Sequence, residues 1–600
     1  MQDRETAPRK PNSTRNRIQR LFRGGPAETV RKTGRYVSRK AAERRFSGNM
    51  TPSPEELTRQ RAEVFSRPLL FSVTVPLYNT PRDLLEEMVD SVCEQSYTQW
   101  ELCLADGSDA EHGDVEAYCR MRAAEDSRIV YRKLERNGGI SENTNACLDM
   151  ASGDYVALFD HDDVLLPNAL YEMRAAVEKT GADFLYSDEL IFQSPRRDRV
   201  IGIRFKPSFS PDSLLTNNYI CHLTVFSREL LERTGRFRRE YDGSQDHDLV
   251  LRLTNRAKRI AHVSKVLYLW RAVPSSVASD IYSKPYAIEA GRSAVEHFLR
   301  TENGIEAKVE STDVFPTMYR VRYPIEGNPR VRVILDARRE MSLPKERLDA
   351  LRDSAGWPNC AWTVLRGGQN GADSCVQLTS RLGESRSALW ARAAEQSEEE
   401  YLLFVDGVPE SVAEGWVREM LEFALQPHVG AVGPKIHFSN GRVRHAGVVI
   451  GMGRGGAAGR PYFRTDGDSA GYFGQMAVAE DVSAVTDCLM VSREKYTAAG
   501  GFDPEYGDAL FDVDFCLRLL EKGYYNVYTP HAPLKMGRRG SARFDAGREY
   551  ASWKRDAEIF RKRNAGILTR GDPYYNPNLS LRYENWQIGA AGEKRGNSAK

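Results

Sequence analysis

The chain has 600 residues, 41% of them hydrophobic, and a formal net charge of +2. This length exceeds what one hydrophobic core supports, so we expect two or more domains. The nine cysteines form no CxxC pair, which argues against a zinc site and is typical of a reducing compartment. We find no run of about 18 apolar residues and no signal peptide, so we expect a cytoplasmic protein without a membrane span.

Positive charge gathers at the N-terminus. Residues 1–50 hold 14 basic and four acidic side chains, so the rest of the chain is net negative. We expect residues 1–66 to form a basic arm, partly disordered and partly helical. Two interpretations stay open: a solvated tail, or a peripheral contact with the anionic inner face of the cytoplasmic membrane. The arm lacks the interleaved aromatic residues typical of nucleic-acid binding, so we expect no nucleic-acid partner.

Predicted strands and helices alternate from residue 67 onward. Leu69–Val75 is typical of a buried strand that Pro76 breaks, and Pro81 opens an amphipathic helix. Further strands are predicted at WELCLAD, RIVYRKL and DYVALF, with a helix at SENTNACLDMA between the last two. This alternation predicts a parallel sheet with helices on both faces, in which ligands bind at the carboxyl ends of the strands.

Three aspartates, Asp160, Asp162 and Asp163, follow the strand that ends at Phe159. Because like charges repel, folding alone would not select this cluster. The carboxylates could cap the next helix, or they could bind Mg²⁺ or Mn²⁺, which takes one or two protein carboxylates and fills its shell with water and phosphate oxygens. We expect Asp160 and Asp162 to hold a metal diphosphate. Asp106 also follows a strand, so it should share the same crevice.

The second half of the chain repeats part of the first. SRELLERTGRF (227–237) and SREKYTAAGGF (492–502) share Ser-Arg-Glu, Gly and Phe, and QDHDLVLRL (245–253) matches FDVDFCLRL (511–519). Agreement over this length predicts two homologous α/β domains. The predicted parts are the arm at 1–66, a first domain at 67–310, a linker at 311–327, a second domain at 328–575 and a C-terminal tail at 576–600.

Four motifs within residues 70–275 resemble glycosyltransferase family 2, the inverting enzymes of GT-A fold. In chain order they are TVPLYNTP, LADGSD, NGGISENTNACLDMASGDYVALFDHDD and GSQDHDLVLRL. The DHDD and GSQDHDL forms resemble two-domain bacterial enzymes that build O-antigen, rhamnan and related surface polysaccharides. Residues 328–535 resemble a second copy. The resemblance implies two tandem GT-A domains, each Rossmann-like with a mostly parallel sheet, behind the basic arm.

The resemblance also implies roles for individual residues. The residues that would bind the nucleotide sugar are Pro76, Tyr78, Asn79, Asp106, Asn137, Gly138 and Asp160. Asp160 and Asp162 would hold Mg²⁺ or Mn²⁺, and Asp246 would be the catalytic base. Asp406 and Asp512 are the candidates in the second domain. Judged on the residues alone, simpler interpretations stay open: turns at 78–79 and 137–139, a helix cap at Asp106 and a surface carboxylate at Asp246.

The implied reaction moves a sugar from a UDP- or dTDP-sugar to a hydroxyl of a lipid-linked or polysaccharide acceptor. The product would be a growing bacterial surface glycan such as O-antigen, capsule or exopolysaccharide. Asp246 would take the proton of the acceptor hydroxyl as it attacks the anomeric carbon, and the metal would stabilise the departing diphosphate.

Several positions depart from the family pattern. Leu269 and, in the second domain, Met536 stand where relatives often carry a late histidine. Asp406 is followed by Gly407 and Val408 rather than by further carboxylates. Three alternatives stay open: a degenerate second domain, a bifunctional transferase, or a non-catalytic scaffold that binds glycan or nucleotide sugar. A metal-dependent phosphohydrolase is disfavoured. His161, His247 and His262 lie near the first-domain motifs, but none stands at the position of the late histidine.

Overall fold

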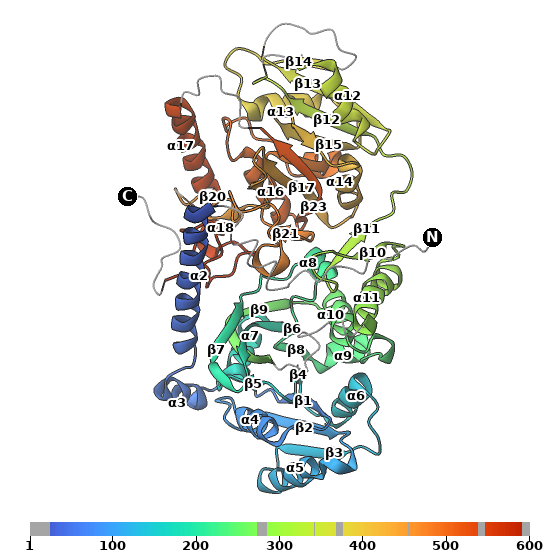
Figure 1. Ribbon diagram of the computed structural model, residues 1–600, viewed down its shortest axis with the longest axis vertical. Coiled ribbons are helices and arrows are strands. Elements are labelled where there is room, and N and C mark those ends of the chain that lie inside the picture. Colours follow the sequence, from blue (N-terminus) through green and yellow to red (C-terminus); the bar gives the residue numbers. More distant parts are fainter. Residues whose placement is uncertain are drawn as a thin grey trace.

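The computed structural model describes residues 25–272, 285–340, 343–367, 376–453, 455–537 and 546–590. Two lobes, each built on a mixed β-sheet, are stacked along the long axis of the molecule (Figure 1). Among the described helices, none is long and apolar enough to cross a membrane.

The first sheet starts with four parallel strands in the spatial order β3–β2–β1–β4 and continues through β8, β6, β9 and β5, with β7 beside β6. β8 runs antiparallel to both β4 and β6, whereas β6 and β9 are parallel. The strand bounds are β1 Phe71–Leu77, β2 Trp100–Asp106, β3 Ile129–Lys133, β4 Tyr155–Leu158, β5 Val164–Leu165, β6 Phe184–Gln193, β7 Arg196–Arg204, β8 Thr224–Ser227 and β9 Ile260–Ala272.

Pro76 does not break the first strand, contrary to our expectation of a strand over Leu69–Val75. β1 runs on to Leu77, and Pro76 pairs with Ala105 of β2. Successive residues of a parallel strand direct their backbone groups to alternate neighbours. Pro76 faces the side of β4, where pairing has already ended at Thr74. The missing N–H of the proline therefore costs no ladder hydrogen bond.

Helices pack on the first sheet where the sequence predicts them. Pro81 precedes α4, whose buried residues recur at helical spacing, and α6 links β3 to β4. Their bounds are α4 Arg82–Cys93, α5 Gly113–Glu125, α6 Ile140–Met150, α7 Ala169–Thr180, α8 Pro211–Thr216, α9 Arg228–Thr234, α10 Gln245–Arg256 and α11 Pro285–Asn303.

The second sheet repeats the eight-strand path of the first. Its order is β14–β13–β12–β15–β22–β17–β23–β16, with the same parallel and antiparallel pairs at corresponding positions. The main bounds are β12 Val331–Asp336, β13 Cys360–Arg366, β14 Val376–Thr379, β15 Tyr401–Asp406, β16 Ser411–Val412, β17 Val429–Phe438, β22 Cys488–Ser492, β23 Tyr525–Met536, α12 Lys345–Asp353, α13 Arg386–Glu395, α14 Trp416–Ala424, α15 Arg493–Ala498 and α16 Phe511–Glu521.

The repeated sequence motifs occupy equivalent places in the two sheets. Ser227 and Ser492 each cap a helix, with the hydroxyl accepting from the backbone N–H three residues on. Asp246 and Asp512 are each the second residue of their helix, α10 and α16. The fold is therefore α/β, as expected, with two tandem domains of one topology.

The region between the two sheets is packed rather than extended. β10 (Lys308–Ser311) and β11 (Tyr319–Arg322) form an antiparallel hairpin within and beside the predicted linker. Arg320 pairs with Glu419 at 2.5 Å, and Arg322 pairs with Glu422 at 2.8 Å, both on α14. One hydrophobic cluster runs from α10 and α11 into β12 and β17, so the two lobes share a core.

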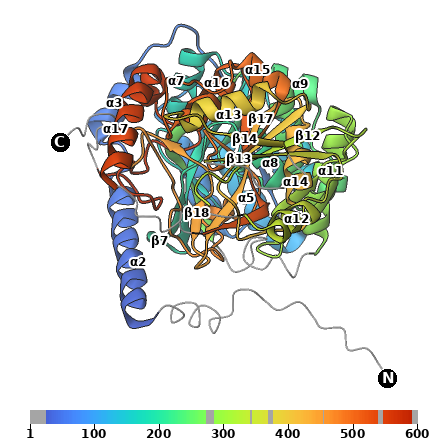
Figure 2. The ribbon, with the colours of Figure 1, turned by 90° about the horizontal axis from the view of Figure 1, so that it is seen from above.

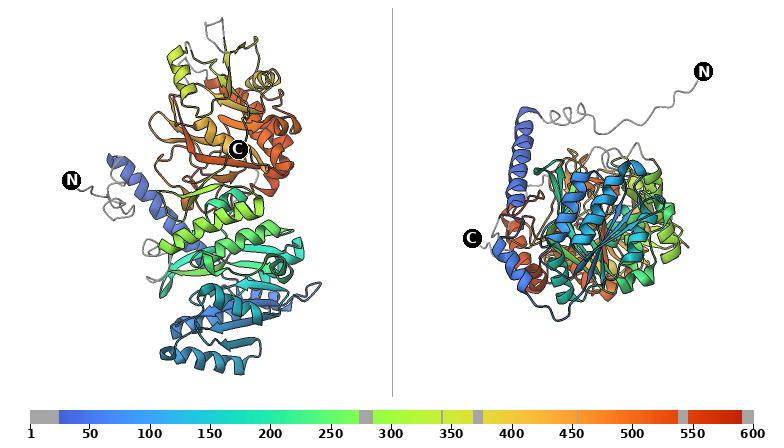
Figure 3. Two further views of the ribbon diagram at one scale, coloured as in Figure 1. Left: turned by 90° about the vertical axis from the view of Figure 1, so that its right-hand side faces the viewer. Right: turned by 90° about the horizontal axis from the view of Figure 1, so that it is seen from below.

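The first and last described segments both contact the first domain. α2 (Gly25–Gly48) lies along one side of the molecule (Figures 2 and 3), where the Phe46 ring meets Phe205 edge-on at 5.1 Å. In the predicted C-terminal tail, the Asn576 amide donates to both oxygens of the buried Asp188, each at 3.0 Å. Residues 1–24 and 591–600 lie outside the described residues.

Candidate functional site

The loops that follow β1 and β2 are tied together at the carboxyl ends of these strands. Gly107 N–H donates to the Leu77 carbonyl at 3.0 Å, and the Ser108 hydroxyl accepts from Asn79 N–H at 2.9 Å. The Asn79 amide donates to Asp109 at 2.8 Å. Next to it, 46% of Tyr78 is exposed, which leaves an aromatic face open to a ligand. Pro76 is buried within β1.

Asp106, at the end of β2, is fully buried and surrounded by donors. One oxygen accepts from Ser108 N–H at 2.8 Å, and the other accepts from the Tyr131 hydroxyl at 2.7 Å and from Lys133 at 3.0 Å. Burial alone would raise the pKa of Asp106, but these donors outweigh it and hold the pKa below its usual value. The carboxylate thus fixes the two loops, and its contact with a nucleotide stays a prediction.

The loop after β3 approaches the same place. The Asn137 side chain accepts from Gly139 N–H at 3.0 Å and from the Asn143 amide at 2.9 Å. A Cβ on Gly107 would come within 3.2 Å of the Asn137 Cα, so the loops after β2 and β3 are in contact. A Cβ on Gly138 would lie 2.3 Å from Glu142, which explains the glycine there.

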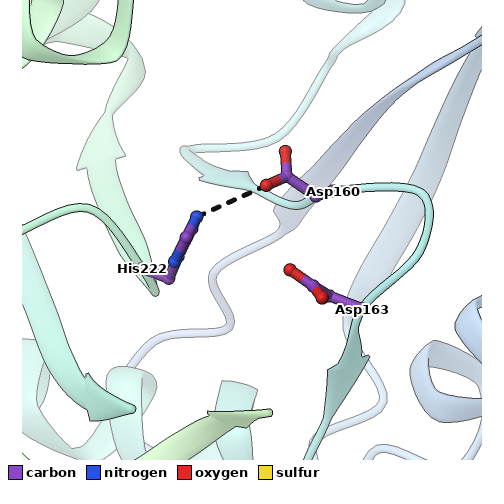
Figure 4. Close-up of side chains that lie close together, drawn as sticks. All are labelled: Asp160, Asp163 and His222. Atoms are coloured by element: carbon purple, nitrogen blue, oxygen red, sulfur yellow. Dashed lines mark ion pairs between the residues drawn. The ribbon is translucent and has the colours of Figure 1, made fainter. Parts of the chain in front are cut away.

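Asp160, Asp163 and His222 converge at the end of β4, and their ligand atoms all lie within 4.8 Å of one another. Figure 4 shows the three side chains pointing toward one another. Asp160 Oδ2 is 3.3 Å from His222 Nε2, and half of the Asp160 side chain is exposed. Burial would raise the pKa of Asp160, but the contact with His222 outweighs it and lowers the pKa.

Asp163 is the anchored member of this group. Its buried carboxylate accepts from the Tyr268 hydroxyl and from Arg271 N–H, each at 2.6 Å, so β9 holds it in place. Burial and the neighbouring aspartates raise its pKa well above the usual value. Asp162 is only partly buried, and its pKa is also raised, by burial and by Asp160. Asp162 lies outside the converging group, and its role as a metal ligand stays a prediction.

His222 was missed in the sequence because it belongs to no recognisable motif. It lies just before β8, which places it beside β4 only once those strands pair. Its ring stacks on Tyr268 with centroids 4.4 Å apart, and its Nδ1 is 3.4 Å from Glu189. Burial would lower the pKa of His222, but Cys221, Asp160 and Glu189 outweigh it and raise the pKa well above the usual value.

Asp246 lies at the start of α10, and its carboxyl group is close enough to Asp160 to feel its charge. Burial and repulsion by Asp160 raise the pKa of Asp246 to about 6. Asp248, two residues further along α10, is held instead by Arg238 and, at 2.7 Å, by Arg252. His247 is buried and bonded to the Leu214 carbonyl at 2.7 Å. Of these three residues, Asp246 has the environment of a proton acceptor.

The chain shares sequence with known proteins. Residues 72–235 match the model of the family described as glycosyl transferase family 2. The chain is 36% identical over 548 residues to the protein y4gI of Sinorhizobium fredii and 33% identical over 538 residues to the O-antigen biosynthesis protein RfbC of Myxococcus xanthus. These alignments cover 86% and 87% of this chain, and 58% and 41% of those relatives, so the chain spans about half of their length.

The putative glycosyltransferase EpsE of Bacillus subtilis is 30% identical over 207 residues, which cover 33% of this chain and 71% of that relative. The chain belongs to glycosyltransferase family 2. Among solved structures, it is similar to the mannosyltransferase PcManGT from Pyrobaculum calidifontis in complex with GDP-Man and Mn²⁺. That similarity has 18% sequence identity and a TM-score of 0.31, and it covers 44% of this chain and 74% of that one.

In the second domain of this family 2 chain, an arginine side chain supplies positive charge at the place equivalent to that of Asp160. Asp406, at the end of β15, pairs with the buried guanidinium of Arg386, the first residue of α13. Asp512 is buried and accepts from the Thr486 hydroxyl at 2.5 Å. Asp487, nearby, pairs with Arg444 and Arg460. Arginines thus neutralise Asp406, at the end of β15, and Asp487, just before β22.

Leu269, the departure from the family pattern in the first domain, lies away from the site. Tyr268 and Trp270 contact His222, whereas Leu269 packs into an apolar cluster with Val164 and Phe192. Because side chains alternate along a strand, residue 269 faces the opposite side of β9. Met536, its counterpart in β23, is likewise buried in a hydrophobic cluster.

Proposed function

We propose that the first domain is an inverting glycosyltransferase that moves a sugar from a nucleoside-diphosphate sugar to a hydroxyl of a growing bacterial surface glycan. The observation that carries this proposal is the placement of Asp246, with its pKa raised to about 6, beside the half-exposed Asp160. A general base works best when its pKa lies near the working pH.

The reaction follows from these positions. Asp246 takes the proton of the acceptor hydroxyl, and the oxygen attacks the anomeric carbon of the donor sugar. The bond from that carbon to the diphosphate oxygen breaks on the opposite face, so the configuration inverts. Asp160, Asp162 and the loops after β1, β2 and β3 hold the donor, with Tyr78 offering its exposed ring to the base.

Mg²⁺ or Mn²⁺ fits the chemistry of this site. The pKa values of Asp162 and Asp163 are raised by burial and by neighbouring carboxylates, so the cluster is short of positive charge. We propose that Asp160 and Asp162 hold the ion together with the donor diphosphate. When bound, the ion supplies Lewis-acid stabilisation for the departing nucleoside diphosphate.

We propose that the second domain does not transfer sugar. Arg386 already pairs with Asp406. Its guanidinium supplies the positive charge that the carboxylates require, so no metal ion is needed there. The domain would instead contribute to acceptor binding. The similarity to RfbC, an O-antigen biosynthesis protein, supports a lipid-linked or polysaccharide acceptor. A cytoplasmic enzyme held at the inner membrane face by residues 1–50 would meet such an acceptor.

A panel of UDP-, dTDP- and GDP-sugars tests the proposal. We expect one donor class to release nucleoside diphosphate in the presence of Mn²⁺ and a polysaccharide or lipid-linked acceptor, with inverted configuration at the anomeric carbon by NMR. Donor binding without release for every donor and acceptor would favour the non-catalytic scaffold. Two distinct linkages, one lost in Asp246→Asn and the other in Asp512→Asn, would show a bifunctional transferase.

A further inference from the structure

His222 and Asp160 are separated by the distance that two ligands of one metal ion would have. His222 Nε2 lies 3.3 Å from Asp160 Oδ2. Ligands about 2.0–2.2 Å from an ion, at angles of about 90–110°, lie roughly 3–3.5 Å apart. The Asp163 carboxylate completes a group whose ligand atoms all lie within 4.8 Å of one another (Figure 4).

The His222 ring is held in one orientation from three sides. Tyr268 stacks on one face at an interplanar angle of 11°, and the Trp270 ring lies 5.4 Å away. Behind the ring, Nδ1 faces Glu189, whose side chain is fully buried. Glu189 pairs with the buried Lys206 at 3.0 Å, and Lys206 in turn donates to the carbonyl of His222 itself.

This arrangement is the one that metal-binding histidines commonly show. Their second ring nitrogen usually faces a carboxylate or carbonyl group, which sets the tautomer and leaves the other nitrogen for the metal. Glu189 is the carboxylate that faces Nδ1, at 3.4 Å and without a hydrogen bond in this structure, and its ion pair with Lys206 holds it there. The residue at position 269 could not serve, because it faces the apolar side of β9.

We propose that His222 is a nitrogen ligand of the divalent cation in the first domain, with Glu189 as its positioning residue. The inference rests on the proposed function for the presence of a metal, but it assigns the ligand to a residue outside the predicted motifs. An imidazole ligand favours Co²⁺ over Mn²⁺, and both over Mg²⁺, more than an all-oxygen site does.

The direct test is pulsed electron paramagnetic resonance of Mn²⁺ bound to the full chain with UDP. We expect ¹⁴N coupling from a coordinated imidazole in the wild type and in His262→Gln, and its loss in His222→Gln. His262 is the matched control, because it too is a buried histidine bonded to an acid, Asp188, but it lies outside the cluster. His161→Gln, in the Asp160–Asp162 loop, should keep the coupling.

Affinity provides the second measurement. We expect His222→Gln to weaken Co²⁺ binding by 10–100-fold and to reduce the preference for Co²⁺ over Mg²⁺, and Glu189→Gln to give a smaller change of the same sign. His262→Gln should keep both values. Because Glu189→Gln leaves Lys206 unpaired, the double variant Glu189→Gln/Lys206→Met separates loss of positioning from loss of folding.

Three results would overturn the assignment: no ¹⁴N coupling in the wild type, coupling retained in His222→Gln, or coupling lost in His161→Gln alone. The wild-type spectrum needs no variant, so misfolding of His222→Gln leaves the test intact. Transfer activity of the wild type, measured separately with the donor panel, decides the proposed function. An active enzyme without nitrogen coordination would refute only the inference on His222.

Discussion

Burial and the charge of Asp160 raise the pKa of Asp246 to about 6, whereas Asp248 on the same helix is neutralised by arginines. The carboxylate must be ionised to accept a proton. We therefore expect kcat/KM for transfer to fall about tenfold per pH unit below pH 6 and to level off above it. A pH–rate profile at several metal concentrations tests this. A bound ion offsets the charge of Asp160, so the inflection should move to lower pH as the metal concentration rises. A profile with no acidic limb down to about pH 4 at any metal concentration would remove Asp246 from the role of base.

Asp246→Asn should lower transfer by about 10²–10⁴-fold and leave donor binding nearly unchanged, because the amide keeps the shape of the carboxyl group but lacks its basicity. Product formation and calorimetric binding of UDP and dTDP with Mn²⁺ measure the two effects. Asp512→Asn is the matched control, since Asp512 holds the same place on α16. Transfer at the wild-type rate in Asp246→Asn would contradict the assignment.

Ionised Asp246 should also lower the free energy of unfolding. Its folded pKa lies above that of an unfolded aspartate, so the folded chain binds more protons between about pH 4 and 6, and its stability declines as pH rises through that window. We expect Asp246→Asn to unfold at a higher temperature than the wild type at pH 8, with the gap closing toward pH 4. Thermal unfolding at both pH values checks this. A lower unfolding temperature in Asp246→Asn at pH 8 would contradict it.

The buried amide of Asn576, together with that of Asn578, joins the C-terminal segment to the first sheet. Asn576 donates to both oxygens of Asp188 and to the Lys206 carbonyl, and Asp188 also accepts from His262. Asn576→Asp would place a second carboxylate against a buried one. We expect a loss of about 3 kcal/mol in the free energy of unfolding, measured by denaturant titration.

Asn440→Asp is the control for that substitution. Asn440 lies in an exposed turn, and its side-chain oxygen accepts from Arg442 N–H, which an aspartate can also do. Its effect on the free energy of unfolding should stay below about 0.5 kcal/mol. Equal effects of the two substitutions would show that the contact between Asn576 and Asp188 does not anchor the segment.

The two domains of the molecule share one topology but differ in what balances their carboxylates. If Arg386 supplies the positive charge in the second domain, the full chain should bind one Mn²⁺–nucleotide complex, and Asp160→Ala should abolish that binding. Calorimetry gives the stoichiometry. Two equivalent sites per chain, or binding retained in Asp160→Ala and lost in Asp512→Asn, would contradict the proposal that the second domain is inactive.

The basic arm concerns the whole molecule and its surroundings. Phe46 of α2 packs on Phe205, next to β7. Deleting residues 1–50 would therefore uncover apolar surface of the first domain. Deleting residues 1–24 is the cleaner variant, and these residues hold seven basic and two acidic side chains. We expect this deletion to release protein from anionic vesicles, and high salt to do the same to the full chain. Equal sedimentation of both proteins with the vesicles would support the interpretation of residues 1–24 as a solvated tail.

The sequence by itself determined the class of fold, the repeat and most of the loops that follow the parallel strands. Hydrophobic periodicity and strand-end polar residues are local signals, so the strands that end at Asp106 and before Asp160 could be predicted before any contact was known. Equal motif spacing in the two halves likewise predicted equal topology, because the same residues cap equivalent helices.

Only the tertiary structure decided which side chains meet. His222 reaches Asp160 because β8 pairs with β4, and Arg386 reaches Asp406 because α13 begins beside the end of β15; neither contact has a signal in sequence spacing. Whether β1 could continue through Pro76 depended on which neighbouring strand the proline backbone faces. In each case, residues far apart in the sequence are brought together by strand pairing and helix packing, which local patterns do not encode.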